Sequence, residues 1–261
     1  MSNHLKRILT GIILILIVGS ILLWGATIHL QFLIFVVSGV ALWEFLSLFF
    51  EKSFFLKTFA IFLSIPIIFN NFLPLSLIHI LIIYFWLINL IFLFIFGLSE
   101  KNRSWQDFQL IFLGLIYIPL VLQFFKDIPF KEICYIMGIA VFSDTCAYYS
   151  GTMWGKKKLW PKVSPKKSWV GAFGSLAGAL IFSILYGSFA FSMKWYLPIF
   201  LAIVLNLGAQ LGDLFESALK RYLNVKDSGG ILPGHGGILD RIDSLLFVCA
   251  IYLIIKNFIT I

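Results

Sequence analysis

The sequence predicts an all-α, polytopic integral membrane protein with about nine transmembrane helices and a cytoplasmic N-terminus. Of its 261 residues, 61% are hydrophobic and only 12% are charged, and the mean hydropathy is +1.00. Soluble domains carry about 25% charged residues, so the chain has no room for separate soluble domains. The net charge of +8 lies in short segments between apolar runs, which indicates membrane orientation and phosphate binding rather than nucleic acid.

Nine apolar stretches approach the ~20 residues that a helix needs to cross the hydrocarbon. The first follows a basic start and resembles a signal peptide, but it has no clear small-x-small cleavage site, so we expect it to be retained. The third is the shortest and contains Pro66, so a re-entrant segment is the alternative there. The stretches lie near residues 8–24, 31–50, 55–71, 77–98, 109–125, 132–152, 169–191, 197–219 and 243–260.

The distribution of basic residues predicts the orientation. With a cytoplasmic N-terminus, all but four of the 20 Lys and Arg residues fall in segments on the inner side. The outer side then holds only Lys126, Lys131, Lys194 and Lys256. Cytoplasmic loops are enriched in Lys and Arg, so the sequence favours this topology.

Polar residues divide the chain into two parts. Residues 1–125 are nearly featureless, and we predict a lipid-facing scaffold that is also the candidate contact region of a homodimer. Glu44 lies in the second apolar stretch; we expect it to reach the cytoplasmic interface, with an intramembrane polar site as the alternative. Residues 126–261 are predicted to be the catalytic region, with cytoplasmic loops at 153–168 and 220–242.

The first polar features of the second half are Asp144 and a basic loop. Asp144 lies inside an apolar stretch, where it needs a partner or a wet cavity; its alternative role is to neutralise a lysine between helices. The loop Lys156–Lys167 contains six lysines, which fix orientation and attract anionic lipid. Small residues follow on one face of the next stretch and predict close helix packing: Gly171, Gly174, Ser175 and Gly178.

A polar stripe runs along the eighth stretch. Its members recur at steps of three and four residues, which places them on one helix face with Glu216 beside them: Asn206, Gln210, Asp213, Ser217 and Lys220. A polar face inside an apolar span must meet protein or water rather than lipid. Asp240 and Asp243 lie one turn apart at the start of the last stretch.

These acids suggest a metal ion and a phosphorylated ligand. Mg²⁺ takes oxygen ligands and leaves positions for water and substrate phosphates. Asp144, Asp213 and Asp240 come from three different helices, and we predict that they converge on one Mg²⁺, with a second cation as an alternative. A glycine-rich turn lets backbone N–H groups approach a phosphate, and His235 within it is predicted either to donate to a phosphate or to hold the turn.

The segment Ser217–Asp243, SALKRYLNVKDSGGILPGHGGILDRID, resembles the signature of the phosphatidate cytidylyltransferases, also called CDP-diacylglycerol synthases. Ser143-Asp144-Thr145, Ser164-Pro165-Lys166-Lys167 and Gly212-Asp213-Leu214 fit the same family pattern. The first half agrees only in being hydrophobic and helical. After the Ser-Pro-Lys-Lys run the family commonly has Thr-Trp-Glu-Gly, whereas this chain has Ser168-Trp169-Val170-Gly171. Any role of that glutamate is therefore absent here or falls to another acid.

The resemblance implies transfer of CMP from CTP to phosphatidate, which gives CDP-diacylglycerol and pyrophosphate at the cytoplasmic face of a bacterial-type inner membrane. The expected partners are CTP, phosphatidic acid and membrane lipid, without nucleic acid. The candidate catalytic residues are Asp144, Asp213, Glu216, Lys220, Arg221, His235, Asp240, Arg241 and Asp243. The candidate substrate-binding residues are Lys166, Lys167, Ser217, Lys220, Arg221, Lys226, Asp227, Ser228, Gly234, His235, Gly236, Gly237 and Arg241.

Other functions remain open at this point. A CTP-dependent lipid kinase, such as a polyprenol kinase, would release CDP, and a related cytidylyltransferase would act on another lipid phosphate. A membrane transporter is the alternative from another class. Secondary transporters commonly show internal repeats and sites at the membrane midplane, whereas this sequence shows no repeat and its polar residues crowd into the second half.

Overall fold

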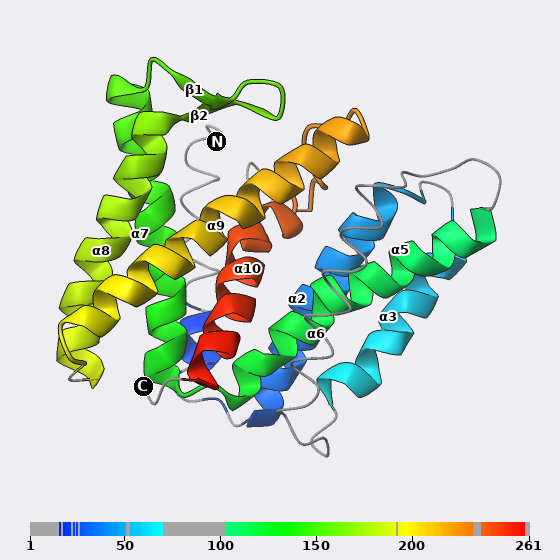
Figure 1. The fold of residues 1–261 in the computed structure, drawn as a ribbon. Helices are drawn as coiled ribbons and strands as arrows, with labels where there is room; N and C mark the ends of the chain where they lie inside the picture. Colours follow the sequence, from blue (N-terminus) through cyan, green and yellow to red (C-terminus); the bar gives the residue numbers. More distant parts are fainter. Residues whose placement is uncertain are drawn as a thin grey trace. The chain divides into compact units, whose positions relative to one another are not determined.

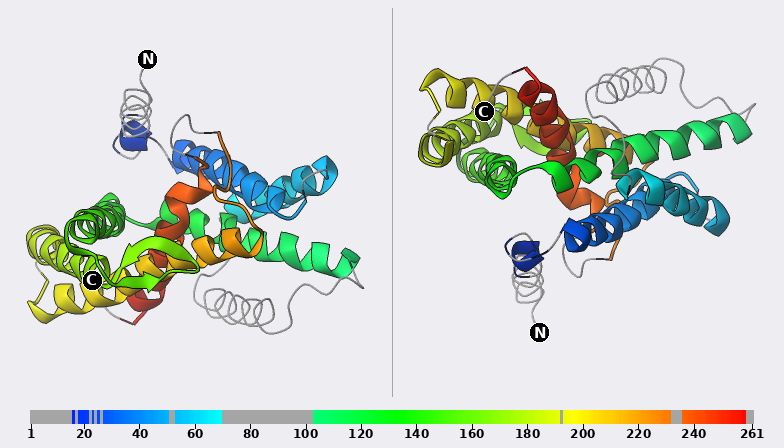
Figure 2. Two further views of the ribbon diagram at one scale, coloured as in Figure 1. Left: turned by 90° about the horizontal axis from the view of Figure 1, so that it is seen from above. Right: turned by 90° about the horizontal axis from the view of Figure 1, so that it is seen from below.

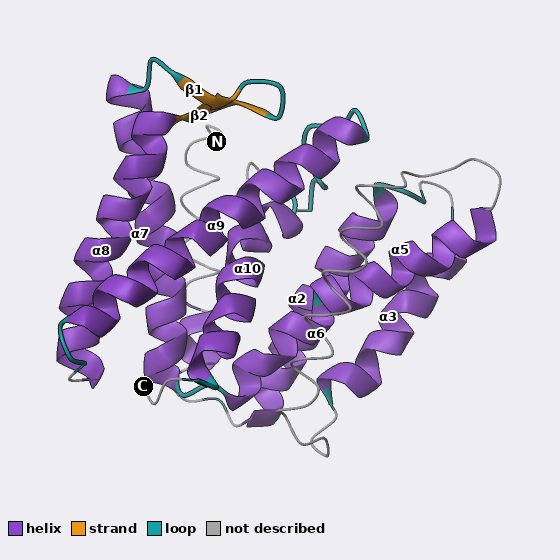
Figure 3. Cartoon of the chain, viewed as in Figure 1, coloured by secondary structure: helices purple, strands orange, loops and turns teal. Residues whose placement is uncertain are grey.

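The structure is a computed structural model that describes residues 16, 18–21, 23, 25, 27–50, 53–69, 103–191, 193–231 and 236–258. This part of the chain is mostly helical (Figures 1 and 3). It contains four segments that are long and apolar enough to cross a bilayer: Thr27–Ser47, Gln109–Asp127, Trp169–Phe191 and Tyr196–Tyr222. These findings agree with the predicted helical membrane protein, although the predicted stretch at 77–98 and most of that at 8–24 lie outside the described residues.

The chain forms two compact units. The first contains residues 1–127 and 227–239, and the second contains residues 128–226 and 240–261. The chain first passes from one unit to the other between Asp127 and Ile128. Residues 227–239, which are part of the segment 217–243, belong to the first unit.

The first unit is built from α2 (Thr27–Ser47), α3 (Phe54–Ile68), α5 (Arg103–Tyr117), the short α6 (Pro119–Leu122) and the 3₁₀ helix η1 (Gln123–Asp127). The stretch expected as one helix at 109–125 is interrupted, because proline cannot donate a backbone hydrogen bond and a new helix begins at Pro119. α2 and α5 approach closely at Gly114, where an added Cβ would lie 2.8 Å from Leu42 Cδ1.

The second unit contains the long helices α7 (Phe130–Trp154), α8 (Trp169–Phe191) and α9 (Tyr196–Tyr222), together with α10 (Leu239–Lys256) from Asp240 onward. α7 and α8 lie side by side, and α9 crosses them (Figure 1). Their closeness depends on small residues: a Cβ on Gly178 would lie 2.7 Å from the Phe142 carbonyl oxygen, and one on Gly171 would lie 3.0 Å from that of Ala147. The predicted glycine-mediated packing is therefore confirmed.

The loop expected at 153–168 contains a β-hairpin that the sequence analysis missed. Strands β1 (Lys158–Trp160) and β2 (Ser164–Ser168) pair antiparallel, and the hairpin lies at the adjoining ends of α7 and α8 (Figures 1 and 2). At its end, Ser168 Oγ accepts a hydrogen bond from the Gly171 N–H at 3.1 Å. This bond satisfies a free donor in the first turn of α8. Lys166 and Lys167 therefore lie on a defined strand.

Polar contacts also join the far ends of these helices. Lys256, in the last turn of α10, pairs with Glu132 in the first turn of α7 at 2.7 Å. The Ser183 hydroxyl of α8 donates to the Pro198 carbonyl of α9 at 2.7 Å and contacts the hydroxyl of Tyr135. Asp144 lies twelve residues beyond Glu132, which corresponds to about 18 Å along α7.

Candidate active site

The polar stripe of α9 faces protein, as predicted. Asn206 is 1% exposed, and its amide donates to Ser143 Oγ of α7 at 3.1 Å and to Ser175 Oγ of α8 at 2.6 Å. Its oxygen accepts a hydrogen bond from Gln210 at 2.7 Å. Hydrogen bonds from buried side chains have a strict geometry and are costly to leave unmade. The network therefore fixes the rotation of α9 against α7 and α8.

Asp213 lies one turn farther along the same face of α9 and pairs with a lysine of the hairpin. Lys167 Nζ is 2.6 Å from Asp213 Oδ2, and the Ser217 hydroxyl donates to Asp213 Oδ1 at 3.3 Å. Asp144 lies within electrostatic range of Asp213, Asp243 and Lys167. The hairpin therefore supplies a positive charge to a place where three helices bring carboxylates together.

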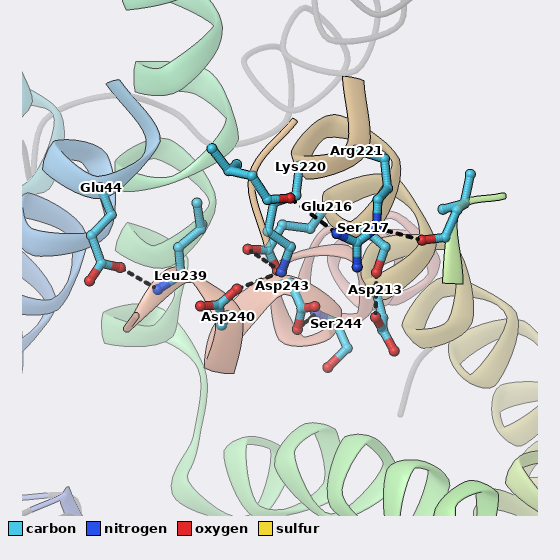
Figure 4. A network of polar contacts seen from close by, with 12 residues as sticks. Glu44, Asp213, Glu216, Ser217, Lys220, Arg221, Leu239, Asp240, Asp243 and Ser244 are labelled. Atoms are coloured by element: carbon cyan, nitrogen blue, oxygen red, sulfur yellow. Dashed lines mark hydrogen bonds and ion pairs between the residues drawn. The ribbon is translucent and has the colours of Figure 1, made fainter. Parts of the chain in front are cut away.

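Lys220 holds a second group of acids. Its ammonium lies 2.5 Å from Asp240 Oδ1 and 3.3 Å from Glu216 Oε1 (Figure 4). The Glu216 side chain is 1% exposed, and neither of its oxygens receives a well-aligned hydrogen bond among the described residues. Asp243 lies within interaction range of Glu216, and one of its oxygens accepts the Ser244 N–H at 2.7 Å. Lys220 is thus the cation that makes this acidic group tolerable in the protein interior.

A cavity of about 490 Å³ opens beside Asp144, Asp213 and Lys167. This volume lies within the range of about 300–1,000 Å³ typical of small-molecule sites. Its lining includes two acids, three lysines and three glycines: Asp144, Asp213, Lys158, Lys166, Lys167, Gly151, Gly155 and Gly171. The cavity combines anionic and cationic side chains with closely approaching backbone, which suits a phosphate-bearing ligand.

The donor set can be compared with the needs of Mg²⁺. Among the described residues, no three His, Cys, Asp or Glu side chains are grouped closely enough to hold a metal ion by themselves. Asp240 pairs with Lys220, whereas Asp144 and Asp213 line the cavity together. Mg²⁺ is often held by only one or two carboxylates with water and substrate phosphates, and Asp144 and Asp213 fit that smaller requirement. The trio of ligands that includes Asp240 stays a prediction.

The remaining candidate residues have varied surroundings. Arg221 donates to two backbone carbonyls, those of Val163 in the hairpin turn at 3.3 Å and Val225 at 3.2 Å, so it fastens the hairpin turn to the end of α9. Ser228 and Gly237 are buried, and Gly236 has a φ of 82°, which favours glycine. Gly234 and His235 lie outside the described residues. Lys166 lines the cavity. Three other candidates are exposed: Lys226, Asp227 and Arg241.

Glu44 lies near the end of α2, and its surroundings were not predicted from the sequence. It is 2% exposed, and its Oε2 accepts the Leu239 N–H at 2.9 Å. Both residues belong to the first unit. The sequence shows a single acid in an apolar stretch and glycines at 229 and 237. The contact between Glu44 and these glycines depends on the tertiary structure.

Comparison with known proteins identifies a family and several relatives. A model of the cytidylyltransferase family matches residues 5–259. The chain is 41% identical over 155 residues to a protein of Staphylococcus aureus (strain COL) named phosphatidate cytidylyltransferase, a match that covers 58% of this chain and 60% of that protein. A protein of the same name from Staphylococcus haemolyticus is 36% identical over 259 residues, covering 93% of this chain and 95% of the relative.

The family match spans nearly the whole chain. It includes the hairpin, both acidic groups and the segment 217–243. It also includes the first unit, in which the sequence alone shows few polar residues or motifs. The chain belongs to the cytidylyltransferase family.

Proposed function

We propose that the protein is a phosphatidate cytidylyltransferase that transfers CMP from CTP to phosphatidate in phospholipid biosynthesis. The names of the relatives and the match to the cytidylyltransferase family support this activity. The observation that carries the proposal is that Asp144, Asp213, Lys166 and Lys167 line one cavity together. A cavity with both charge signs at the end of apolar helices suits a reaction between a soluble nucleotide and a lipid headgroup.

The chemistry requires little proton transfer. A phosphate oxygen of phosphatidate attacks the α-phosphorus of CTP, a new P–O bond forms, and the bond from the α-phosphorus to the bridging oxygen breaks to release pyrophosphate. The phosphate monoester is already anionic at neutral pH, so a strong general base is unnecessary. The main barrier is the approach of two polyanions in line, which positioning and charge neutralisation lower.

Side chains of this chain can supply both effects. Lys167 pairs with Asp213 at 2.6 Å, and an entering triphosphate would draw the ammonium toward its own oxygens. Lys166, on the same strand, adds a second positive charge at the cavity. Lys220 contacts Glu216 at 3.3 Å and Asp240 at 2.5 Å and holds both side chains beside α9. Lysine ammonium groups act as point charges toward phosphate and need no fixed plane.

We propose that Mg²⁺ takes part, held by Asp144 and Asp213. When bound, it would neutralise phosphate oxygens and hold water in its remaining positions. The same acids face Lys167 in the present structure, so the lysine and a metal ion would share the neutralisation of this carboxylate pair. Removal of divalent ions with EDTA is part of the test below.

We further propose nine transmembrane helices with the N-terminus and the hairpin on the cytoplasmic side of a bacterial inner membrane. The four long apolar segments among the described residues and the excess of basic residues in the predicted inner segments support this arrangement. With this topology, CTP reaches the cavity from the cytoplasm while the acyl chains of phosphatidate stay in the bilayer. A homodimer formed through the first half is part of the same proposal.

The activity is tested by product analysis with the protein purified in detergent. With phosphatidate, CTP and Mg²⁺, we expect stoichiometric pyrophosphate and CDP-diacylglycerol, and EDTA should stop the reaction. ATP, GTP and UTP in place of CTP serve as controls. Release of CDP together with a newly phosphorylated lipid would instead identify a lipid kinase. Pyrophosphate release only with another lipid phosphate would identify a cytidylyltransferase of different substrate.

A further inference from the structure

Glu44 lies deep in the first unit, far along the chain from the acids of the candidate active site. Its carboxylate is 2% exposed, and Oε2 accepts the backbone N–H of Leu239 at 2.9 Å. Figure 4 shows the side chain directed at this N–H. Leu239 is the first residue of α10, so a carboxylate from α2 satisfies one of the N–H groups that a helix leaves free at its start.

The loop that precedes α10 is also packed on this carboxylate. A Cβ on Gly229 would collide with Glu44 Oε1 and lie 2.7 Å from Glu44 Cδ, and a Cβ on Gly237 would lie 2.5 Å from Glu44 Oε2. Contacts this short are almost never tolerated, so only glycine fits at both positions beside a glutamate. Two segments of the loop, 228–231 and 236–239, therefore meet at one side chain.

Candidate site residues lie within these segments and directly after them. Asp240, which directly follows Leu239, is the carboxylate that pairs with Lys220 at 2.5 Å. Ser228 and Gly237 were predicted to bind phosphate, and both are buried. A side chain that holds the Leu239 backbone and packs against Gly229 and Gly237 therefore also fixes the positions of Ser228 and Asp240.

We propose that Glu44 is a positioning residue: its buried carboxylate gathers the segments 228–231 and 236–239 and fixes the first turn of α10 for cytidylyl transfer. It touches neither substrate in this role and acts through the backbone that it holds. The proposal rests on the proposed function for its effect on rate. Its structural part, the ordering of the loop by Glu44, stands apart from the identity of the substrates.

Glycine variants give a sharp test because the loop offers a matched pair. Neither Gly229 nor Gly230 has a left-handed backbone, and a Cβ on Gly230 would meet no atom within 4 Å. Gly229→Ala is expected to lower kcat about 100-fold, the upper effect of disturbing a group that supports a site, whereas Gly230→Ala should stay within about threefold of wild type.

The collision itself is tested in a second background. Glu44→Asp withdraws the carboxylate by one methylene. As a single variant it should therefore lower kcat, and it should also make room for a Cβ at position 229. In that background, Gly229→Ala should cause less than about a threefold further loss. If Gly229→Ala lowers kcat by the same factor in both backgrounds, Glu44 does not set the loop and the proposal is wrong.

Glu44→Gln and Glu44→Ala separate positioning from general stability. Both should lower kcat while changing the KM for CTP by less than about threefold, with the glutamine variant less affected because an amide oxygen can still accept the Leu239 N–H. Gly39→Ala, where a Cβ would meet only Ile61 at 3.8 Å, is the control for changes in α2. Wild-type kcat in Glu44→Ala would overturn the proposal.

Hydrogen exchange measured without substrates makes the outcome independent of the reaction. Glu44→Ala, which removes the acceptor of the Leu239 N–H, should speed exchange at residues 228–231 and 236–241 and leave 130–150 of α7 unchanged. Equal acceleration in both regions would show a general loss of stability and contradict a positioning role. If the loop responds as expected but no cytidylyl transfer is found with any variant or with wild type, the proposed function fails and the structural role of Glu44 stands.

Discussion

Asp213→Asn is expected to lower the rate of CDP-diacylglycerol formation by about three orders of magnitude, the upper range for loss of one electrostatic group at a reacting centre. The substitution preserves the shape of the side chain and removes its charge. Asparagine can still accept the Ser217 hydroxyl, now at 3.3 Å, so the fold of α9 should persist. Initial rates of pyrophosphate release at saturating CTP and phosphatidate measure the effect.

Two comparisons make this result specific to the site. Asp127→Asn removes an exposed acid of η1, outside the second unit, and should leave the rate unchanged. The melting temperature of Asp213→Asn in detergent should match that of wild type within a few degrees. If Asp213→Asn keeps more than a third of the wild-type rate, Asp213 has no essential part in the reaction.

Lys220→Met is expected to lower the free energy of unfolding by about 3–5 kcal/mol, the range for removing one partner of a buried ion pair. The Lys220 side chain is 13% exposed, and it neutralises Glu216 and Asp240 at 3.3 Å and 2.5 Å. Methionine fills a similar volume but leaves these carboxylates without that ammonium. Chemical unfolding in mixed detergent micelles measures the loss.

A charge-compensating variant and a matched lysine test this explanation. Adding Glu216→Gln to Lys220→Met should recover part of the stability, because one uncompensated charge is removed with the lysine. Lys256→Met breaks the pair with Glu132 at the other end of α10, where the lysine side chain is 35% exposed, and should cost less because water can replace the ammonium. A loss below about 1 kcal/mol for Lys220→Met, typical of exposed pairs, would contradict the buried network.

Local periodicity explains what the sequence predicted correctly. The steps of three and four residues from Asn206 to Lys220 predicted one polar face on α9, and this face binds Ser143, Ser175 and Lys167. The spacing of glycines in the following helix predicted the close approach of α7 and α8. Helix geometry alone relates such residues, so neither prediction required knowledge of the tertiary fold.

The choice of partners could not be predicted in the same way. Lys167 pairs with Asp213 only because a hairpin, unexpected in a lysine- and proline-rich loop, holds it over α9. The pair between Asp240 and Lys220 was not predicted either. Glu44 meets Leu239 across 195 residues of chain. These contacts depend on how separate helices pack, which residue spacing does not encode.

We propose that CTP binds in the cavity that the hairpin, α7, α8 and α9 line, with Asp144, Asp213 and Lys167 at its wall. The most direct measurement is photocrosslinking of a photoreactive CTP analogue to the purified protein, followed by mass spectrometry of the labelled peptides. We expect adducts within residues 144–172 or 210–213, suppressed by an excess of CTP. Adducts that CTP suppresses but that fall only within residues 27–69 or 103–127 would contradict the claim.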